Sequence, residues 1–242
     1  MPLLRDGLAD FEGRLEYWDS RAETAWVVAE APGGTHESTS RRLPELARLI
    51  AAVRGAPIRS FGAVGIRLND AAGRADRMMR PDETLYLHPR RGRLPAKSLV
   101  VGQHDLPDVV LEVDLTTDIR RGKLPLYEAW GFPELWVLVP AAGATRRRPA
   151  GVTIHRLDGD RYRVAPASVA LPGWTAPEIH VALTEPLTTP RTCRVLERVG
   201  RALGAREGTG PEDDPMLGVL MGRERAEGQA AGRAEGQVLS VM

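Results

Sequence analysis

The fold is constrained most by two short apolar segments. The stretch that separates them has the features of a helix. Residues 109–113 and 135–139 are rich in branched apolar side chains and are bounded by proline, glycine or charge, as strands are. Between them Thr117 or Asp118 offers a helix cap, and residues 120–130 predict a crossover helix. A strand, a helix and a strand in this order predict an α/β protein, with a mixed sheet flanked by helices.

The remaining segments extend this pattern on both sides. Apolar residues at helical spacing predict a helix over 38–53, and a turn at 158–160 predicts a hairpin between 152–157 and 162–164. Alternating apolar and polar residues predict further strands at 15–18, 24–29, 64–68, 84–87 and 99–101.

The character of the chain changes after Pro186. We expect residues 1–186 to form the main domain and residues 187–242 a helical, partly flexible C-terminal tail, with an amphipathic helix at 192–203. An imperfect eight-residue repeat spans 225–240, and each of its glycines would weaken a helix by about 1 kcal/mol. A solvated tail is therefore favoured over an ordered oligomerisation helix, which would support a homodimer.

Composition excludes several classes of protein. The single cysteine, Cys193, rules out a disulfide framework or a thiolate zinc site within one chain. No segment approaches the length of about 20 apolar residues that a membrane helix needs, so we expect a cytoplasmic protein with no membrane partner. All but two of the 33 basic residues are arginine, which makes the positions of Lys97 and Lys123 informative.

Common nucleotide-binding and serine-hydrolase motifs are absent, and a set of carboxylates stands out instead. Asp82 leads into one predicted strand, and Glu112 interrupts an apolar one. If the two strands are antiparallel neighbours, these acids could share a Mg²⁺ ion, with Mn²⁺ as a substitute. On the second strand Asp108 lies roughly 13 Å from Glu112 and Asp114 roughly 7 Å, so Asp114 is the better auxiliary.

These residues resemble a known family. The segment 107–140, PDVVLEVDLTTDIRRGKLPLYEAWGFPELWVLVP, is similar to the signature of the Uma-type restriction endonucleases, a branch of the PD-(D/E)XK nuclease superfamily. The RPDETLYL segment at 80–87, His36 before the first helix and the RAEG repeat of the tail support the resemblance. It extends over about residues 10 to 185.

The resemblance implies a metal-dependent endonuclease that hydrolyses DNA. It assigns the motif aspartate to Asp82, the motif acid to Glu112 and the migrated lysine to Lys123, with the Val113 carbonyl as an extra metal ligand. The run from Asp118 to Lys123 is shorter than the family's commonest version. The first helix of this fold often adds another acid, for which the candidates are Glu37 and Glu45. His36, which follows a glycine-rich turn, could cap the helix or contact phosphate, and a structural histidine is an equally good interpretation.

Simpler interpretations compete for several of these residues. An aspartate after a proline, such as Asp82 or Asp108, commonly caps a turn. Tyr127, Trp130 and Trp136 fit a core better than base stacking.

Arginines could bind a DNA backbone, and the pair Arg120 and Arg121 beside the proposed site is favoured over solvated loop clusters. Two other functions stay open: a catalytically silent nuclease fold that only binds nucleic acid, and an interaction protein that acts through its C-terminal tail. Tight metal binding at Glu112 would separate the endonuclease from both.

Overall fold

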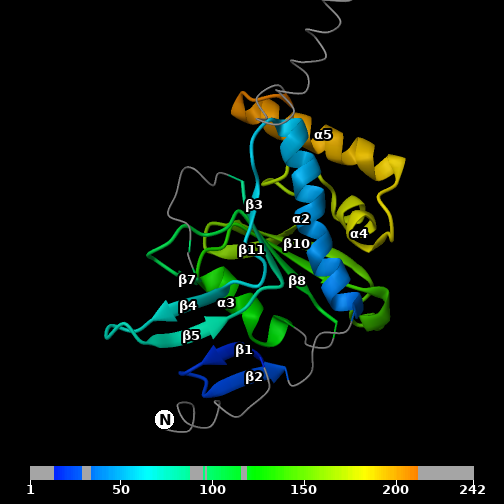
Figure 1. Cartoon of the computed structure of the whole chain (residues 1–242). Helices are drawn as coiled ribbons and strands as arrows, with labels where there is room; N and C mark the ends of the chain where they lie inside the picture. The colour runs from blue at the N-terminus through cyan, green and yellow to red at the C-terminus, as the bar shows by residue number, and fades with distance from the viewer. Residues whose placement is uncertain (1–13, 29–33, 88–94, 96, 116–118, 212–242) are drawn as a thin grey trace, which may run out of the picture.

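The computed structural model describes residues 14–28, 34–87, 95, 97–115 and 119–211 (Figure 1). Two sheets organise them. The six-stranded sheet has the order β11-β10-β9-β8-β6-β3, in which β8 and β9 are parallel and the other neighbours antiparallel. Its strands are β3 (Arg59–Ser60), β6 (Glu83–Tyr86), β8 (Val109–Val113), β9 (Glu134–Val139), β10 (Gly151–Asp158) and β11 (Arg161–Ala165).

The five-stranded sheet is formed by the N-terminal part of the chain and has the order β2-β1-β5-β4-β7. Only β4 and β7 pair in parallel. Its strands are β1 (Arg14–Asp19), β2 (Thr24–Val28), β4 (Gly65–Asn69), β5 (Ala75–Met79) and β7 (Ser98–Val100). The chain passes from this sheet to the six-stranded one between β5 and β6, over Arg80, Pro81 and Asp82.

Helices cover the six-stranded sheet on both faces. On one face lie α2 (Gly34–Arg54), α4 (Ala176–Thr184) and α5 (Pro190–Glu207), and on the other α3 (Lys123–Ala129), which follows the short 3-10 turn η1 (Ile119–Arg121) (Figure 1). A second 3-10 turn, η2 (Ala141–Gly143), follows β9. None of the helices in the described ranges is long and apolar enough to cross a bilayer.

Two apolar clusters lie on the two faces of this sheet. Towards α2, Leu111 and Trp136 pack with Trp174, and the two indole rings meet edge to face with centroids 5.6 Å apart. Towards α3, Val110 and Leu135 pack with Tyr127. Side chains therefore alternate between the two clusters along β8 and β9, as they must on a pleated strand.

The predicted mixed α/β fold is confirmed, including the parallel pair β8 and β9 and the antiparallel neighbours β6 and β8. The crossover helix is shorter than predicted: the regular helix begins at Lys123, and Gly122 at its N-cap forms no side-chain cap bond. Pro125 lies in the first turn, where its missing N–H removes no helical hydrogen bond. The sequence analysis missed β5 and α4.

The core continues beyond residue 186, where the sequence suggested a division. Leu196, Val199 and Leu203 of α5 are buried with α2. At the end of α5, Glu207 forms an ion pair with Arg54 of α2 at 3.0 Å. An added Cβ at Gly200 would lie 2.7 Å from Cβ of Val53, so the glycine permits the close packing of the two helices. Helix α5 therefore packs closely on the main body through α2.

Candidate active site

Glu112 is the carboxylate around which the site is built. It is the fourth residue of β8 and points to the α3 side, because its neighbours Leu111 and Val113 point into the α2 cluster. Only 2% of its surface is exposed. A charge in such a position needs partners, since transfer of an isolated carboxylate out of water costs several kcal/mol.

Lys123 at the start of α3 is the first partner. Its ammonium donates to Oε2 of Glu112 at 3.0 Å, to Oε2 of Glu16 at 3.4 Å and to the backbone carbonyl of Arg80 at 2.5 Å. An ammonium has three N–H donors, and each finds an acceptor here. The lysine predicted from the sequence is thus brought directly to the predicted acid.

Tyr127 is the second partner. Its hydroxyl donates to Oε1 of Glu112 at 2.6 Å. Tyr127 and Lys123 lie four residues apart on α3 and therefore share one face of the helix. The sequence analysis placed Tyr127 in the core, which is correct because it is fully buried, but missed its hydrogen bond. The spacing from Lys123 was the available signal.

Glu16 is a site residue that sequence reasoning missed altogether. In the pairing of β1 with β2, Leu15 lies opposite Val27 and Tyr17 opposite Trp26, so Glu16 is the additional residue of a β-bulge. A bulge changes the direction of a side chain relative to regular alternation. The bulge explains how a residue of the five-stranded sheet reaches a lysine packed against the other sheet.

Asp82 lies where the chain crosses from β5 to β6. Its backbone N–H donates to the carbonyl of Leu111 at 3.1 Å, and its Oδ2 accepts from the N–H of Val113 at 2.6 Å. Asp82 is therefore fixed against the two residues that flank Glu112, by its backbone on Leu111 and by its carboxylate on Val113. This bond also agrees with the simpler interpretation of Asp82 as a residue that binds a backbone N–H at the entrance to a strand.

The electrostatics of the cluster are those of coupled buried charges. Burial raises the pKa of Glu112 to about 7, and the charge of Asp82 acts in the same direction, against the opposing effect of Lys123. Burial disfavours the charged form of Lys123, but the attraction of Glu112 and Asp82 outweighs it and raises the pKa of the lysine. Burial, with Glu112 beside it, also raises the pKa of Tyr127, which keeps its proton as a donor.

Close packing of the two sheets fixes the start of α3. An added Cβ at Gly122 would lie 2.8 Å from Cη2 of Trp26 and 3.2 Å from Cζ of Tyr17. Those two rings stack with centroids 4.7 Å apart. Gly122 therefore lets the five-stranded sheet approach the residue directly before Lys123, which positions the ammonium.

The structure does not bring the two auxiliary aspartates to this cluster. Asp108 lies before β8, where its Oδ2 accepts from the N–H of Leu87 at 2.6 Å. Asp114 is buried after the end of β8 and forms an ion pair with Arg148 at 2.8 Å. Arg148 also donates to the carbonyls of Leu115 and Gly143, so it closes the loop after β9.

The other predicted residues contribute less to the described site. Glu45 is exposed on α2, the helix that covers the opposite face of the sheet, and it is therefore not part of the cluster. The side chains of His36, Glu37 and Arg121 lie outside the described residues. Arg120 is exposed on η1, within one turn of Lys123.

The donor set fits a hard divalent cation. The charge of the neighbouring Asp82 raises the pKa of Glu112, and a cation bound between the two carboxylates would relieve this repulsion. The Val113 carbonyl accepts from the N–H of Leu115 at 3.0 Å and keeps a second lone pair. Within the described ranges no three His, Cys, Asp or Glu side chains form a metal-binding group. Water would complete the shell, as is usual for Mg²⁺.

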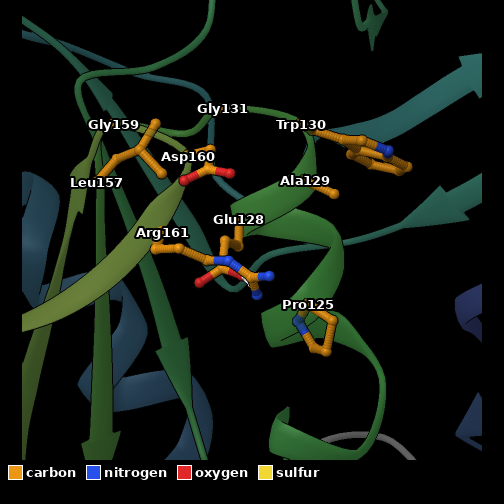
Figure 2. Close-up of a pocket in the computed structure, with 9 residues that line it drawn as sticks. All are labelled: Pro125, Glu128, Ala129, Trp130, Gly131, Leu157, Gly159, Asp160 and Arg161. Atoms are coloured by element: carbon orange, nitrogen blue, oxygen red, sulfur yellow. Dashed lines mark hydrogen bonds and ion pairs between the residues drawn. The ribbon is translucent and has the colours of Figure 1, made fainter.

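A hollow of about 650 Å³ lies on the β11 side of α3, away from this cluster (Figure 2). Its charged groups face each other: Arg161 pairs with Glu128 at 3.2 Å, and the same carboxylate accepts from the N–H of Tyr162. The hollow contains none of the cluster residues, and its Arg161 and Glu128 are already paired with each other. It is therefore a surface recess rather than the candidate active site.

Comparisons with known proteins identify the family of the chain. Residues 9–188 match the sequence model of the Uma2 family, whose description is "Putative restriction endonuclease". A crystal structure of a "putative nuclease belonging to DUF820" from Anabaena variabilis ATCC 29413 aligns at 14% identity, with a TM-score of 0.37, over 74% of this chain and 87% of the other. No curated protein matches the chain.

Proposed function

Because the chain belongs to the Uma2 family of restriction-endonuclease-like proteins, we propose that it is a Mg²⁺-dependent endonuclease that hydrolyses phosphodiester bonds in DNA. One observation carries the proposal: a buried carboxylate, Glu112, lies beside a second one, Asp82, and is paired with a buried lysine, Lys123. Two acids can hold a divalent metal ion, and a lysine can stabilise the charge that develops on the phosphate, so the three groups suit metal-assisted hydrolysis of a phosphodiester.

Each residue has a role that its surroundings support. Asp82 and Glu112, with the Val113 carbonyl, would hold the cation. Bound Mg²⁺ polarises the scissile phosphate and lowers the pKa of a coordinated water. Tyr127 holds one oxygen of Glu112 and so limits rotation of the carboxylate.

Lys123 is held ready to act on the reacting phosphate. Its three donors are occupied, and the contact with Glu16 is the longest at 3.4 Å. In the reaction this contact is the one to be exchanged for a phosphate oxygen or the attacking water, while Glu112 and the Arg80 carbonyl keep the ammonium in place. Glu16 is thus a positioning residue, whose carboxylate pairs with the ammonium of Lys123 between turnovers.

The test is cleavage of supercoiled plasmid DNA by the purified chain with Mg²⁺ or Mn²⁺. We expect nicked and linear products, no products in EDTA, and a loss of more than about 100-fold in rate for Glu112→Gln, the size typical for removal of one key electrostatic group. The same variant should lose calorimetric Mn²⁺ binding. Glu197→Gln, on the exposed side of α5, is the matched control and should behave as wild type.

Two outcomes would contradict the proposal. If Glu112→Gln cleaved DNA at the wild-type rate, a contaminant or another site would be responsible. If the wild type bound DNA in a salt-sensitive manner but never cleaved it with either metal, the chain would be a catalytically silent nuclease fold.

A further inference from the structure

A groove of about 400 Å³ lies on the five-stranded sheet, next to the crossing that carries Asp82. The ends of β4 and β5 and the segment before β7 form its walls. Three cations line it, namely Arg67, Arg80 and Lys97, together with the apolar side chains of Phe61 and Met78. Its lining includes no acidic residue among those described.

The strand register places these cations on one face of the sheet. Arg67 of β4 lies opposite Met78 of β5, and Ile66 opposite Met79, so each pair shares a face. Ile66 and Met79 are fully buried in the cluster around α3. Arg67 and Met78 therefore point away from that cluster, and both line the groove together with Arg80.

Nothing in the described part of the chain balances the charge of the two arginines in this groove. Within the described residues, neither guanidinium forms a hydrogen bond or an ion pair, and the Nε atoms of Arg67 and Arg80 are shielded from solvent without an acceptor. By contrast, Arg74 in the turn between β4 and β5 pairs with Asp70 at 3.1 Å. Donors that have lost water without gaining an acceptor favour an incoming anion.

The groove and the candidate active site share a wall. The carbonyl of Arg80 accepts from the ammonium of Lys123, while its side chain lines the groove, and Asp82 follows two residues later. A strand whose phosphate reached Asp82 and Glu112 would therefore continue directly past Arg80.

We propose that this groove binds the phosphodiester backbone of the nucleic-acid strand next to the scissile phosphate. Arg67, Arg80 and Lys97 contact the phosphate oxygens, and Phe61 and Met78 contact the sugars. The proposal rests on the proposed endonuclease function. It locates strand binding on β4, β5 and the segment before β7 rather than on Arg120 and Arg121 alone.

The test is the salt dependence of DNA binding, measured by fluorescence anisotropy with a labelled duplex in EDTA, so that no cleavage occurs. The logarithm of the DNA-binding constant falls linearly with the logarithm of the salt concentration. Each phosphate contact that is removed should make this slope less steep by about 1. We expect this for Arg67→Gln and for Lys97→Gln, and a reduction of about 2 for the double variant. Arg67→Lys, which keeps the charge, should keep the slope, and Arg201→Gln on α5 is the matched control for net charge.

The outcomes separate this inference from the function on which it rests. If the double variant is folded, as judged by circular dichroism, and has the wild-type slope, the groove does not bind DNA and the proposal is wrong. Cleavage of DNA by the wild type would still support the endonuclease function. A wild type that neither binds nor cleaves DNA would overturn both. Inorganic phosphate could also raise the melting temperature of the wild type but not of the double variant, while the salt dependence of DNA binding is the same for both. This result would identify a site for small anions and would also overturn the proposal.

Discussion

The two faces of β8 are built from alternate residues of one strand, yet they differ in kind. On the α2 face, Val109, Leu111 and Val113 belong to an apolar cluster. On the α3 face, Val110 joins an apolar cluster, whereas Glu112 lies in a buried network with Lys123. Two adjacent residues of the strand, Leu111 and Glu112, therefore lie in an apolar core and in a charged site, respectively.

The two faces differ in the substitutions that they tolerate. Apolar packing tolerates exchange for side chains of similar volume, because the hydrophobic effect has no direction. The charged network does not, because each member is satisfied by a particular partner at hydrogen-bonding distance. Buried ion pairs add little net stability over apolar packing, so the network is better explained by chemistry than by stability.

The largest effect should follow from removal of the lysine. Lys123→Ala leaves Glu112 and Glu16 buried without their shared cation, which should lower the free energy of unfolding of the metal-free protein by about 3 to 5 kcal/mol. Turnover should fall at least about 100-fold, while Mg²⁺ affinity should persist. Urea unfolding, plasmid cleavage and calorimetry measure the three quantities.

Lys123→Arg provides the matched comparison. A planar guanidinium is larger than an ammonium and cannot meet three acceptors arranged around a single nitrogen, so rescue of turnover should be poor although the charge is kept. Cleavage by Lys123→Ala at the wild-type rate under saturating Mg²⁺ would remove the lysine from the mechanism.

The α2 face should respond in the opposite way. Leu111→Ala creates a cavity next to Trp136 in a fully buried cluster and should cost about 3 to 5 kcal/mol of stability. Because Leu111 points away from Glu112, turnover per folded molecule should stay near the wild-type value at a temperature well below the melting point. A loss of turnover as large as that of Lys123→Ala would show that the two faces are coupled.

Local signals explain what could be predicted from the sequence. The segment from β8 to β9 has strong strand runs and a resemblance that assigns Glu112 and Lys123, and the structure joins these two residues at 3.0 Å. A short crossover helix between parallel strands fixes their approach through covalent connection alone. No long-range pairing had to be known.

Long-range features explain what could not be predicted. Glu16 reaches Lys123 across 107 residues of sequence because of a bulge in β1, and period-two alternation contains no sign of such an insertion. The candidate acid of the first helix was sought by analogy, and Glu45 proved to lie on the opposite side of the sheet. Asp114, the expected auxiliary, lies directly after the end of β8 and forms an ion pair with Arg148, a partner 34 residues away that the local pattern does not indicate.

The smallest expected effect concerns pH, and it also distinguishes the two faces. Burial raises the pKa of Glu112 from 4.5 to about 7, so between these values the folded, metal-free protein binds more protons than the unfolded one. Its free energy of unfolding should therefore fall as the pH rises through this window, by at most about 3 kcal/mol from this group. Urea unfolding at pH 5 and pH 8 measures the change.

Glu112→Gln isolates the contribution of this carboxyl. Glu83, whose pKa burial also raises, and His155, whose pKa burial lowers, titrate in both proteins and cancel in the difference. We expect the wild type to lose more stability than the variant on going from pH 5 to pH 8, and Mg²⁺ to reduce that difference, because a bound cation favours the ionised carboxylate. Leu111→Ala should shift stability equally at both pH values. If wild type and Glu112→Gln showed the same pH dependence without metal, Glu112 would stay ionised throughout, and the ion pair with Lys123 would outweigh its burial.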